Sequence, residues 1–186
     1  MPNTSIRANS VKKIYYSWKD VQGAVLEIAR QMSIDDRWRP DYIVGITRGG
    51  SIPAVLLSQY TGIPMKSLDV SLRDGGDLVS NSGMAEDAFG HLIYDPMCSD
   101  DGKKNILIVD DINDQGSTIA WIKQDWQNCC HPTDERWEDE IWHRSVRFAT
   151  LTNNLASKES VDYSVWEVNK AEEDCWLVYP WEDFWK

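Results

Sequence analysis

The chain has 186 residues, of which 42% are hydrophobic and 26% are charged, a composition typical of one globular domain with a sizeable core. Its net charge of −11 argues against nucleic acid or an anionic membrane as the main partner. No apolar run is long enough to span a membrane, and residues 1–10 lack the apolar segment of a signal peptide. We therefore expect a single domain over residues 1–186, located in the cytoplasm.

The first predicted element is a helix that begins after Ser17. Ser17 and Asp20 have the spacing of a helix cap, loosely a capping box. The apolar residues that follow recur at helical spacing and predict a face that packs on a sheet. They are Val21, Ala24, Val25, Ile28, Ala29 and Met32.

Two strands and a second helix follow. Residues 42–46 are apolar, as in a buried strand, and residues 64–72 predict a second strand. Between them, residues 52–61 predict a helix, because Pro53 falls in its first turn and Gly62 directly follows its last residue.

A glycine-rich loop, Gly45-Ile-Thr-Arg-Gly-Gly-Ser51, joins the first strand to this helix. Gly49 and Gly50 allow a close approach of the backbone, and Arg48 supplies positive charge. The loop is not a nucleotide P-loop, because Ser51 stands where that motif requires Lys. An ordinary βα turn is the alternative interpretation.

The next two stretches differ in character. Residues 73–104 are polar and too long for a passive connection, and residues 91–94 within them predict a short strand. Residues 125–144 are charged and rich in Trp, with a predicted helix over residues 135–143, and we interpret them as an insertion that could contact another subunit. The two His residues of this insertion, His131 and His143, are expected at the surface. The four cysteines of the chain (98, 129, 130 and 175) are expected to be free thiols, since C-x-x-C spacing is absent.

The most informative stretch is Asn105 to Thr118. Residues 106–109 are four aliphatic residues, as expected of a strand buried on both faces. They end at Asp110 and Asp111, and a helical pattern begins near Thr118. In an open parallel sheet such a turn lies at the carboxyl ends of the strands, where ligands bind.

The residue types of this turn suggest a sugar phosphate. Backbone N–H groups at the start of a helix suit a phosphate, and Gly116 lets the backbone approach it, while Ser117 and Thr118 add hydroxyl donors. Asp110 and Asp111 would repel a phosphate and are better suited to ribose hydroxyls or to a metal. The alternative is an ordinary helix N-terminus rich in Asp.

With a further strand at residues 146–152, helices and strands alternate along the chain. This order predicts an α/β fold with a doubly wound, mostly parallel sheet.

The sequence Ile108-Val-Asp-Asp-Ile-Asn-Asp-Gln-Gly-Ser-Thr118 resembles the 5-phosphoribosyl diphosphate (PRPP) signature of type I phosphoribosyltransferases. That signature has a hydrophobic strand, two adjacent acids, two residues, Asp, one residue, Gly, one residue and Thr. Weaker matches at the glycine-rich loop and the C-terminal tail extend the resemblance over most of the chain. They are most similar to purine phosphoribosyltransferases specific for xanthine, guanine or hypoxanthine.

The resemblance implies a site for PRPP and Mg²⁺. Asp110 and Asp111 would hold the ribose hydroxyls, directly or through Mg²⁺, and Arg48 would stabilise the departing pyrophosphate. A cis peptide is expected between Arg48 and Gly49, and residues 73–104 would be a mobile loop that closes over the site. The other PRPP-binding residues implied are Thr47, Gly49, Gly50, Ile112, Asn113, Gln115, Gly116, Ser117 and Thr118.

The resemblance also implies a small hood built from C-terminal and N-terminal segments, with the base pocket over about residues 153–186. Trp176 would stack on the purine, the backbone at Leu177 would read the ring edge, and Glu182 would bind Mg²⁺. Asp114 would lie near purine N7 as a catalytic residue. Relatives place a Lys that meets the 6-oxo group where this chain has Asn153 or Asn154, and Lys158 is the nearest basic residue.

These features predict a Mg²⁺-dependent enzyme that transfers the phosphoribosyl group of PRPP to a purine. The resemblance implies that the purine is a 6-oxopurine and that the protein forms a homodimer or homotetramer. Two alternatives are a PRPP- or nucleotide-sensing regulator without catalysis, and a transferase for adenine or a pyrimidine.

Overall fold

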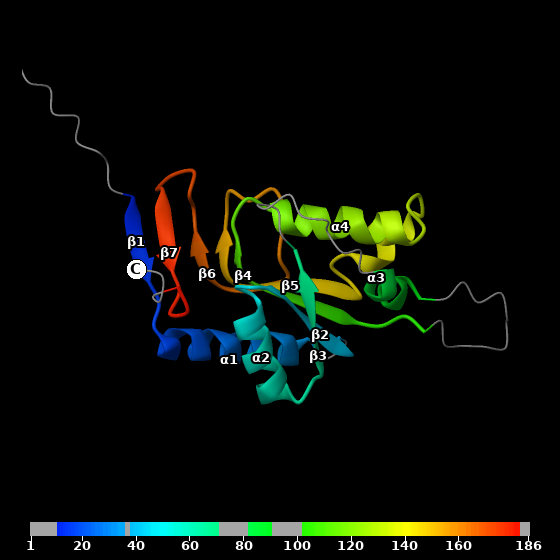
Figure 1. The fold of residues 1–186 in the computed structure, drawn as a ribbon, viewed down its shortest axis with the longest axis horizontal. Coiled ribbons are helices and arrows are strands. Elements are labelled where there is room, and N and C mark those ends of the chain that lie inside the picture. The colour runs from blue at the N-terminus through cyan, green and yellow to red at the C-terminus, as the bar shows by residue number, and fades with distance from the viewer. Residues whose placement is uncertain (1–10, 36–37, 71–81, 91–101, 183–186) are drawn as a thin grey trace, which may run out of the picture.

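A computed structural model describes residues 11–35, 38–70, 82–90 and 102–182. Within these residues, five strands form a parallel sheet of order β3-β2-β4-β5-β6, and β1 pairs with β7 in a separate small sheet (Figure 1). In chain order the elements are β1 (Lys12–Tyr15), α1 (Trp18–Ile34), β2 (Tyr42–Thr47), α2 (Ser51–Thr61), β3 (Met65–Asp69), α3 (Ser82–Phe89), β4 (Ile106–Asn113), α4 (Ser117–Cys129), the π-helical turn η1 (Trp137–Ile141), β5 (Val146–Asn154), β6 (Tyr163–Val168) and β7 (Cys175–Val178).

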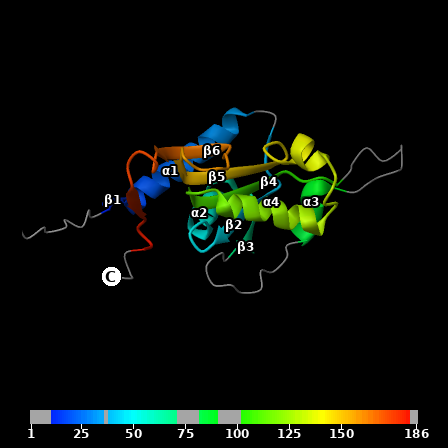
Figure 2. The ribbon, with the colours of Figure 1, turned by 90° about the horizontal axis from the view of Figure 1, so that it is seen from above.

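Helices cover both faces of the main sheet, which confirms the predicted doubly wound α/β fold. Helices α1 and α2 lie on one face, and α3 and α4 lie on the other (Figure 1; Figure 2 shows the same layers from above). Each face of the sheet has its own hydrophobic core. Along β4, Leu107 and Val109 pack into the core on the side of α1 and α2, whereas Ile106 and Ile108 pack into the core on the side of α3 and α4. Burial of both faces is the reason for the continuous apolar run in this strand.

Several local predictions are confirmed. Ser17 and Asp20 form the capping box at the start of α1. Gly62 ends α2 with a φ of 71°, a left-handed conformation that glycine adopts without strain.

The predicted strand ends are less accurate. β3 ends at Asp69 rather than at residue 72, whereas β4 continues past Val109 to Asn113. Ile112 and Asn113 pair with Thr152 and Asn153 of β5. The expected end of this strand at residue 109 is therefore wrong, because strand pairing, and not hydrophobicity, sets the end of β4.

The stretch 73–104 contains a helix that the sequence analysis did not predict. In α3, Asp87 accepts hydrogen bonds from the Tyr42 hydroxyl at 3.0 Å, Lys66 Nζ at 3.1 Å and Lys104 Nζ at 2.6 Å. These contacts fasten α3 to the start of the sheet. The strand predicted at residues 91–94, and most of the expected mobile loop, lie outside the described residues.

The Trp-rich stretch 125–144 belongs to the core. Trp126, Trp137 and Trp142 are buried, and the rings of Trp137 and Trp142 stack with centroids 5.1 Å apart. These side chains are thus not available for the subunit contact that we predicted. The predicted helix over residues 135–143 is reduced to η1, and no helix in the described ranges is long and apolar enough to cross a membrane.

The first and last described strands lie together. β1 and β7 pair in parallel, so that Ile14 lies beside Leu177. Figure 1 shows this pair beside β6, at the end of the molecule away from β3. This pairing joins the N-terminal strand β1 to the C-terminal segment expected to form the hood.

Candidate active site

The site lies where the strand order of the main sheet reverses. β2 is followed along the chain by its neighbour β3, whereas β4 lies on the other side of β2 and leads to β5 and β6. The loops after β2 and β4 therefore diverge at their carboxyl ends, which is the usual position of a ligand in an open α/β sheet. The two loops predicted to bind PRPP are these two loops.

Two glycines bring the loops together. A Cβ atom on Gly50 would lie 2.7 Å from Asp110 Cα, and one on Gly49 would clash with the Asp111 carboxylate. A side chain at residue 50 would meet backbone and push the loops apart, whereas one at residue 49 would displace the Asp111 carboxylate. The two glycines thus allow the close packing of the loops.

The rest of the β2 loop departs from one prediction. The cis peptide joins Thr47 to Arg48, so its expected position between Arg48 and Gly49 is wrong. Thr47 is the last residue of β2, one residue beyond the predicted end of this strand, and donates a hydrogen bond to Asp69 Oδ1 at 2.8 Å. Arg48 is exposed.

The acidic pair lies at the end of β4 without an ion pair to any described residue. Asp110 Oδ1 accepts the Asp111 N–H at 2.9 Å. Burial raises the pKa of Asp110 well above its usual range, and the nearby charge of Asp111 adds to this effect. Burial likewise raises the pKa of Asp111. Both residues keep some exposure to solvent, so a ligand or a cation can reach them.

Beside the acids, the start of α4 offers backbone donors. Gly116 has a φ of 82° and precedes the first helical residue, Ser117. The first backbone hydrogen bond of the helix runs from Ala120 N to Gly116 O. The N–H groups of Ser117, Thr118 and Ile119 therefore face out of the helix end, where an anion is favoured.

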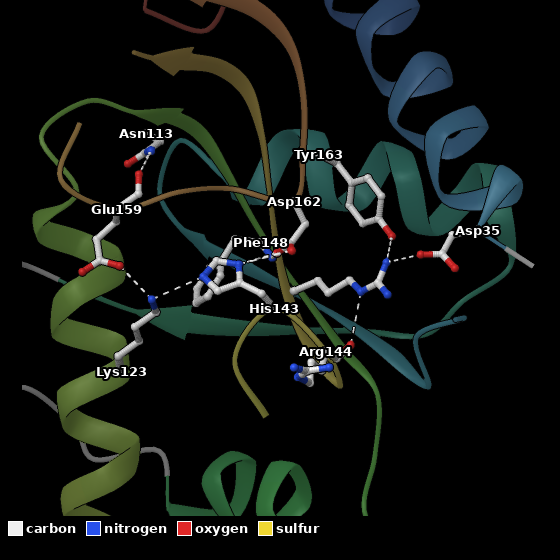
Figure 3. Close-up of polar contacts among 10 residues, drawn as sticks. Asp35, Asn113, Lys123, His143, Arg144, Phe148, Glu159, Asp162 and Tyr163 are labelled. Carbon is white, nitrogen blue, oxygen red and sulfur yellow. Dashed lines mark hydrogen bonds and ion pairs between the residues drawn. The ribbon is translucent and has the colours of Figure 1, made fainter. Parts of the chain in front are cut away.

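A brace supports this loop from the side of β5 (Figure 3). Asn113 Nδ2 donates to the Glu159 carbonyl at 2.7 Å, and Lys123 Nζ donates to Glu159 Oε2 at 2.7 Å. Lys123 Nζ also lies 3.4 Å from His143 Nε2, and His143 Nδ1 lies 3.1 Å from Asp162 Oδ2. The Asn113 side chain is buried in this brace, so its expected contact with PRPP is limited to its backbone.

Asp114 is held by Asn154 and by Lys170, of which only Asn154 was expected near the site. Its Oδ1 lies 3.0 Å from Lys170 Nζ, and its carbonyl accepts a hydrogen bond from Asn154 Nδ2 at 2.8 Å. Asn153 points elsewhere, because its Oδ1 accepts from Asn113 Nδ2 at 2.9 Å. No local motif marks Lys170, because it comes from the turn after β6 and meets Asp114 only in the folded chain.

The C-terminal segment is linked to the acidic pair by Tyr179. The Tyr179 hydroxyl donates to the Asp111 carbonyl at 2.9 Å and lies 2.8 Å from Thr152 Oγ1. Burial raises the pKa of this buried phenol, and the charge of Asp111 adds to the effect. Tyr179 has no signal of its own in the sequence, since an aromatic residue near Trp181 is typical of an ordinary core.

The expected base and metal residues are only partly brought together. Trp176 is 54% exposed, so its indole face is free to stack, whereas Leu177 is buried and leaves only its backbone for recognition. No three acidic, His or Cys side chains among the described residues converge as a metal site. Glu182 therefore forms no three-ligand group with Asp110 and Asp111 among the described residues, and its role in binding Mg²⁺ stays a prediction.

A hollow of about 300 Å³ lies elsewhere, between the segments 39–41 and 62–64 that precede β2 and β3. It is at the amino ends of these strands, at the opposite edge of the sheet from the acidic pair. Its position gives it no part in the candidate site.

Comparison with known proteins points to one family. The model of the phosphoribosyl transferase domain matches residues 12–182. The hypoxanthine-guanine phosphoribosyltransferase of Schizosaccharomyces pombe is 28% identical over 192 residues, covering 91% of this chain and 89% of that protein. The xanthine-guanine phosphoribosyltransferase of Cereibacter sphaeroides is 26% identical over 176 residues, covering 92% of this chain and 87% of that protein.

A solved structure agrees with these sequence relatives. The purine phosphoribosyltransferase of Pyrococcus horikoshii superposes with a TM-score of 0.61 at 26% identity, covering 92% of this chain and 94% of that one. The similarity thus spans the main sheet and the C-terminal segment together.

Proposed function

This chain belongs to the phosphoribosyl transferase family, and we propose that it transfers the 5-phosphoribosyl group of PRPP to a purine base, with release of pyrophosphate. The observation that carries the proposal is the acidic pair Asp110 and Asp111, which lies without an ion pair among the described residues, between the start of α4 and the glycine-rich loop. The names of the similar proteins favour a 6-oxopurine as the acceptor.

The site suits the donor substrate in three parts. The N–H groups and hydroxyls of Ser117 and Thr118 hold the 5′-phosphate, with Gln115 and Gly116 supplying backbone. Asp110 and Asp111 accept hydrogen bonds from the ribose hydroxyls. Backbone at Gly49 and Gly50 lies against the acidic pair, in position to contact the pyrophosphate.

The two acids also suit a divalent cation. Mg²⁺ prefers oxygen ligands and is commonly held by one or two carboxylates together with substrate phosphates, which the acidic pair provides without Glu182. When bound, Mg²⁺ would neutralise charge on the pyrophosphate. Arg48, exposed at the mouth of the loop, stabilises the same developing charge.

The transfer exchanges one bond at the sugar for another. The lone pair of purine N9 forms a bond to C1 of the ribose, and the bond from C1 to the pyrophosphate oxygen breaks. The neutral base that attacks through N9 carries its imidazole proton on N7, and the Asp114 carboxylate hydrogen-bonds this N–H and takes up the proton as the bond from N9 to C1 forms. Trp176 stacks on the base, a contact worth about 1–3 kcal/mol for an aromatic side chain.

The test is pyrophosphate release from PRPP and Mg²⁺ with each free base in turn. We expect release with hypoxanthine, guanine or xanthine, and none without a base. Release with none of the bases, together with a PRPP-dependent rise in melting temperature, would replace the enzyme by a PRPP-sensing regulator. Release only with adenine or a pyrimidine would correct the acceptor.

Two further predictions accompany the proposal. We propose that the protein acts in the cytoplasm and forms a homodimer or homotetramer, as predicted from the family resemblance. Light scattering of the purified protein measures the subunit number.

A further inference from the structure

Asn154, the last residue of β5, is a buried amide that joins three segments around the candidate site. Its side chain is 5% exposed. Its Nδ2 donates to the Asp114 carbonyl at 2.8 Å. Its Oδ1 accepts the backbone N–H of Lys170 at 3.0 Å and that of Ala156 at 3.2 Å. One side chain therefore holds the turn after β4, the loop after β5 and the turn after β6 together.

These partners allow one orientation of the Asn154 amide. Two backbone N–H groups face its oxygen and a backbone carbonyl faces its nitrogen, so the reversed amide would place donors against donors. Both polar atoms of the side chain are thus committed to the protein. Any effect of Asn154 on a bound base must therefore pass through another residue.

That residue is Asp114, whose carboxylate is held by one of its two oxygens. Asp114 Oδ1 lies 3.4 Å from Asn154 Nδ2 and 3.0 Å from Lys170 Nζ. Within the described parts of the chain, Oδ2 makes no hydrogen bond or ion pair, and the side chain is 43% exposed. The protein thus orients one oxygen and leaves the other to accept from a ligand.

From this geometry we infer that Asn154 is a positioning residue, which orients the Asp114 carboxylate so that its second oxygen meets the N7 proton of the bound base. The inference rests on the proposed function, in which Asp114 takes up that proton. Proton transfer requires hydrogen-bond reach, about 2.6–3.2 Å between heavy atoms. A misplacement of about 1 Å can therefore cost roughly 100-fold in rate.

Lys170 does not supply this precision alone. Its ammonium contacts Asp114 from the end of a flexible four-carbon chain, whereas the Asn154 amide is short and buried. Asn154 also binds the backbone N–H of Lys170, so it sets the point from which that chain reaches Asp114. The buried amide thus acts on the carboxylate both directly and through its cationic partner.

The experiment is a double-mutant cycle between Asn154→Asp and Asp114→Asn, with the base that gives the fastest release of pyrophosphate. Asn154→Asp keeps an oxygen for the N–H groups of Lys170 and Ala156 but removes the donor to Asp114. We expect it to lower the single-turnover rate by about 10- to 100-fold and to change the Kd for PRPP by less than about threefold. In the Asp114→Asn background it should change the rate by less than about threefold, because the residue through which it acts is already disabled.

Asn105→Asp is the matched control. Asn105 directly precedes β4, at the opposite end of this strand from Asp114, and its Nδ2 donates to the Arg39 carbonyl at 3.1 Å. The substitution likewise replaces a donor to a backbone carbonyl by a negative charge. It should leave both the single-turnover rate and the affinity for PRPP as in wild type.

The other outcomes have distinct meanings. Equal losses in rate and in PRPP affinity would overturn the inference, because Asn154 would then support the whole turn after β4. The same loss of rate in the wild-type and Asp114→Asn backgrounds would overturn it too. If Asn154→Asp does not fold, Asn154→Ser, whose side chain is too short to reach Asp114, must give the same cycle, and a wild-type rate in that variant would contradict the inference. A wild-type protein without activity on any base would instead overturn the proposed function itself.

Discussion

Two groups of charged side chains flank helix α4, and they are built in opposite ways. Before its first turn, Asp110 and Asp111 lie side by side with raised pKa values and no ion pair to a described residue. Along its side, Lys123 pairs with Glu159, while His143 pairs with Asp162. The paired group satisfies its own charges and therefore supports the fold. The acidic pair leaves its charges for a ligand, at a cost in stability.

The largest effect is expected at the residue that meets the reacting base. Asp114→Asn keeps the shape of the side chain but weakens the acceptor for the N7 proton. We expect kcat to fall by about 10²- to 10⁴-fold, whereas the affinity for PRPP stays near that of wild type. Steady-state kinetics together with PRPP titration measures both, and equal losses in turnover and PRPP affinity would remove the proposed role of Asp114.

A methyl group between the two loops should be the next most damaging change. Gly49→Ala places a Cβ against the Asp111 carboxylate, so that carboxylate must move away from the ribose. Loss of a charge-assisted hydrogen bond is worth about 1.5–3 kcal/mol, which predicts a KM for PRPP roughly 10- to 100-fold higher.

Gly23→Ala is the matched control for Gly49→Ala. Gly23 lies in α1, where a Cβ would meet nothing within 4 Å. The control should stabilise the protein by about 0.5–1 kcal/mol with unchanged kinetics. If Gly49→Ala also had wild-type kinetics, the close contact between the loops would have no part in binding.

A smaller effect is expected from the hydroxyl that joins the C-terminal segment to the acidic pair. Tyr179→Phe removes the hydrogen bonds to the Asp111 carbonyl and to Thr152, and should lower the free energy of unfolding by about 0.5–1.5 kcal/mol. Tyr163→Phe removes a hydroxyl bound by Arg147, away from the site. Both variants should lose stability, but only Tyr179→Phe should raise the KM for PRPP. Equal KM values in the two variants would show that the Tyr179 hydroxyl has no part in PRPP binding.

The smallest expected effect is a dependence of the free energy of unfolding on pH, caused by Asp110. Because the folded pKa of Asp110 is raised above its unfolded value, the folded state binds more protons than the unfolded state between these two pKa values. Stability of the ligand-free protein therefore falls as the pH rises from the unfolded value of about 4 through the raised folded pKa. Asp110→Asn should lose this fall and gain stability near neutral pH.

Denaturant unfolding at a series of pH values measures this effect. Asp162→Asn is the comparison, because Asp162 accepts the Phe148 N–H at 2.8 Å and faces His143. This variant should be less stable than wild type near neutral pH. A loss of stability in Asp110→Asn as large as that in Asp162→Asn would mean that the acidic pair supports the fold.

Much of this architecture could be predicted from the sequence. The apolar run of β4, the capping box at Ser17 and the glycine after α2 are local signals, and each lies where it was expected. The acidic pair and Gly116 were likewise recognisable. They are close together in the sequence, between a buried strand and the start of a helix, and therefore lie close together in the fold.

The remaining parts depend on contacts between distant residues. Lys170 meets Asp114, and Tyr179 meets Asp111, only because β6 and the C-terminal segment lie beside β4 and β5. The pairing of Asn113 with Asn153 likewise extended β4 and occupied Oδ1 of Asn153, a residue that we predicted to bind the base. Such partners have no fixed spacing in the sequence, so no motif could have identified them.

The central claim is that the acidic pair at the end of β4 holds the ribose of PRPP, and calorimetric titration of PRPP tests it most directly. Wild type should bind PRPP in the presence of Mg²⁺, and Asp110→Asn with Asp111→Asn together should weaken this binding by at least about tenfold while the protein stays folded. Equal affinity for PRPP in the double variant and in wild type would contradict the account.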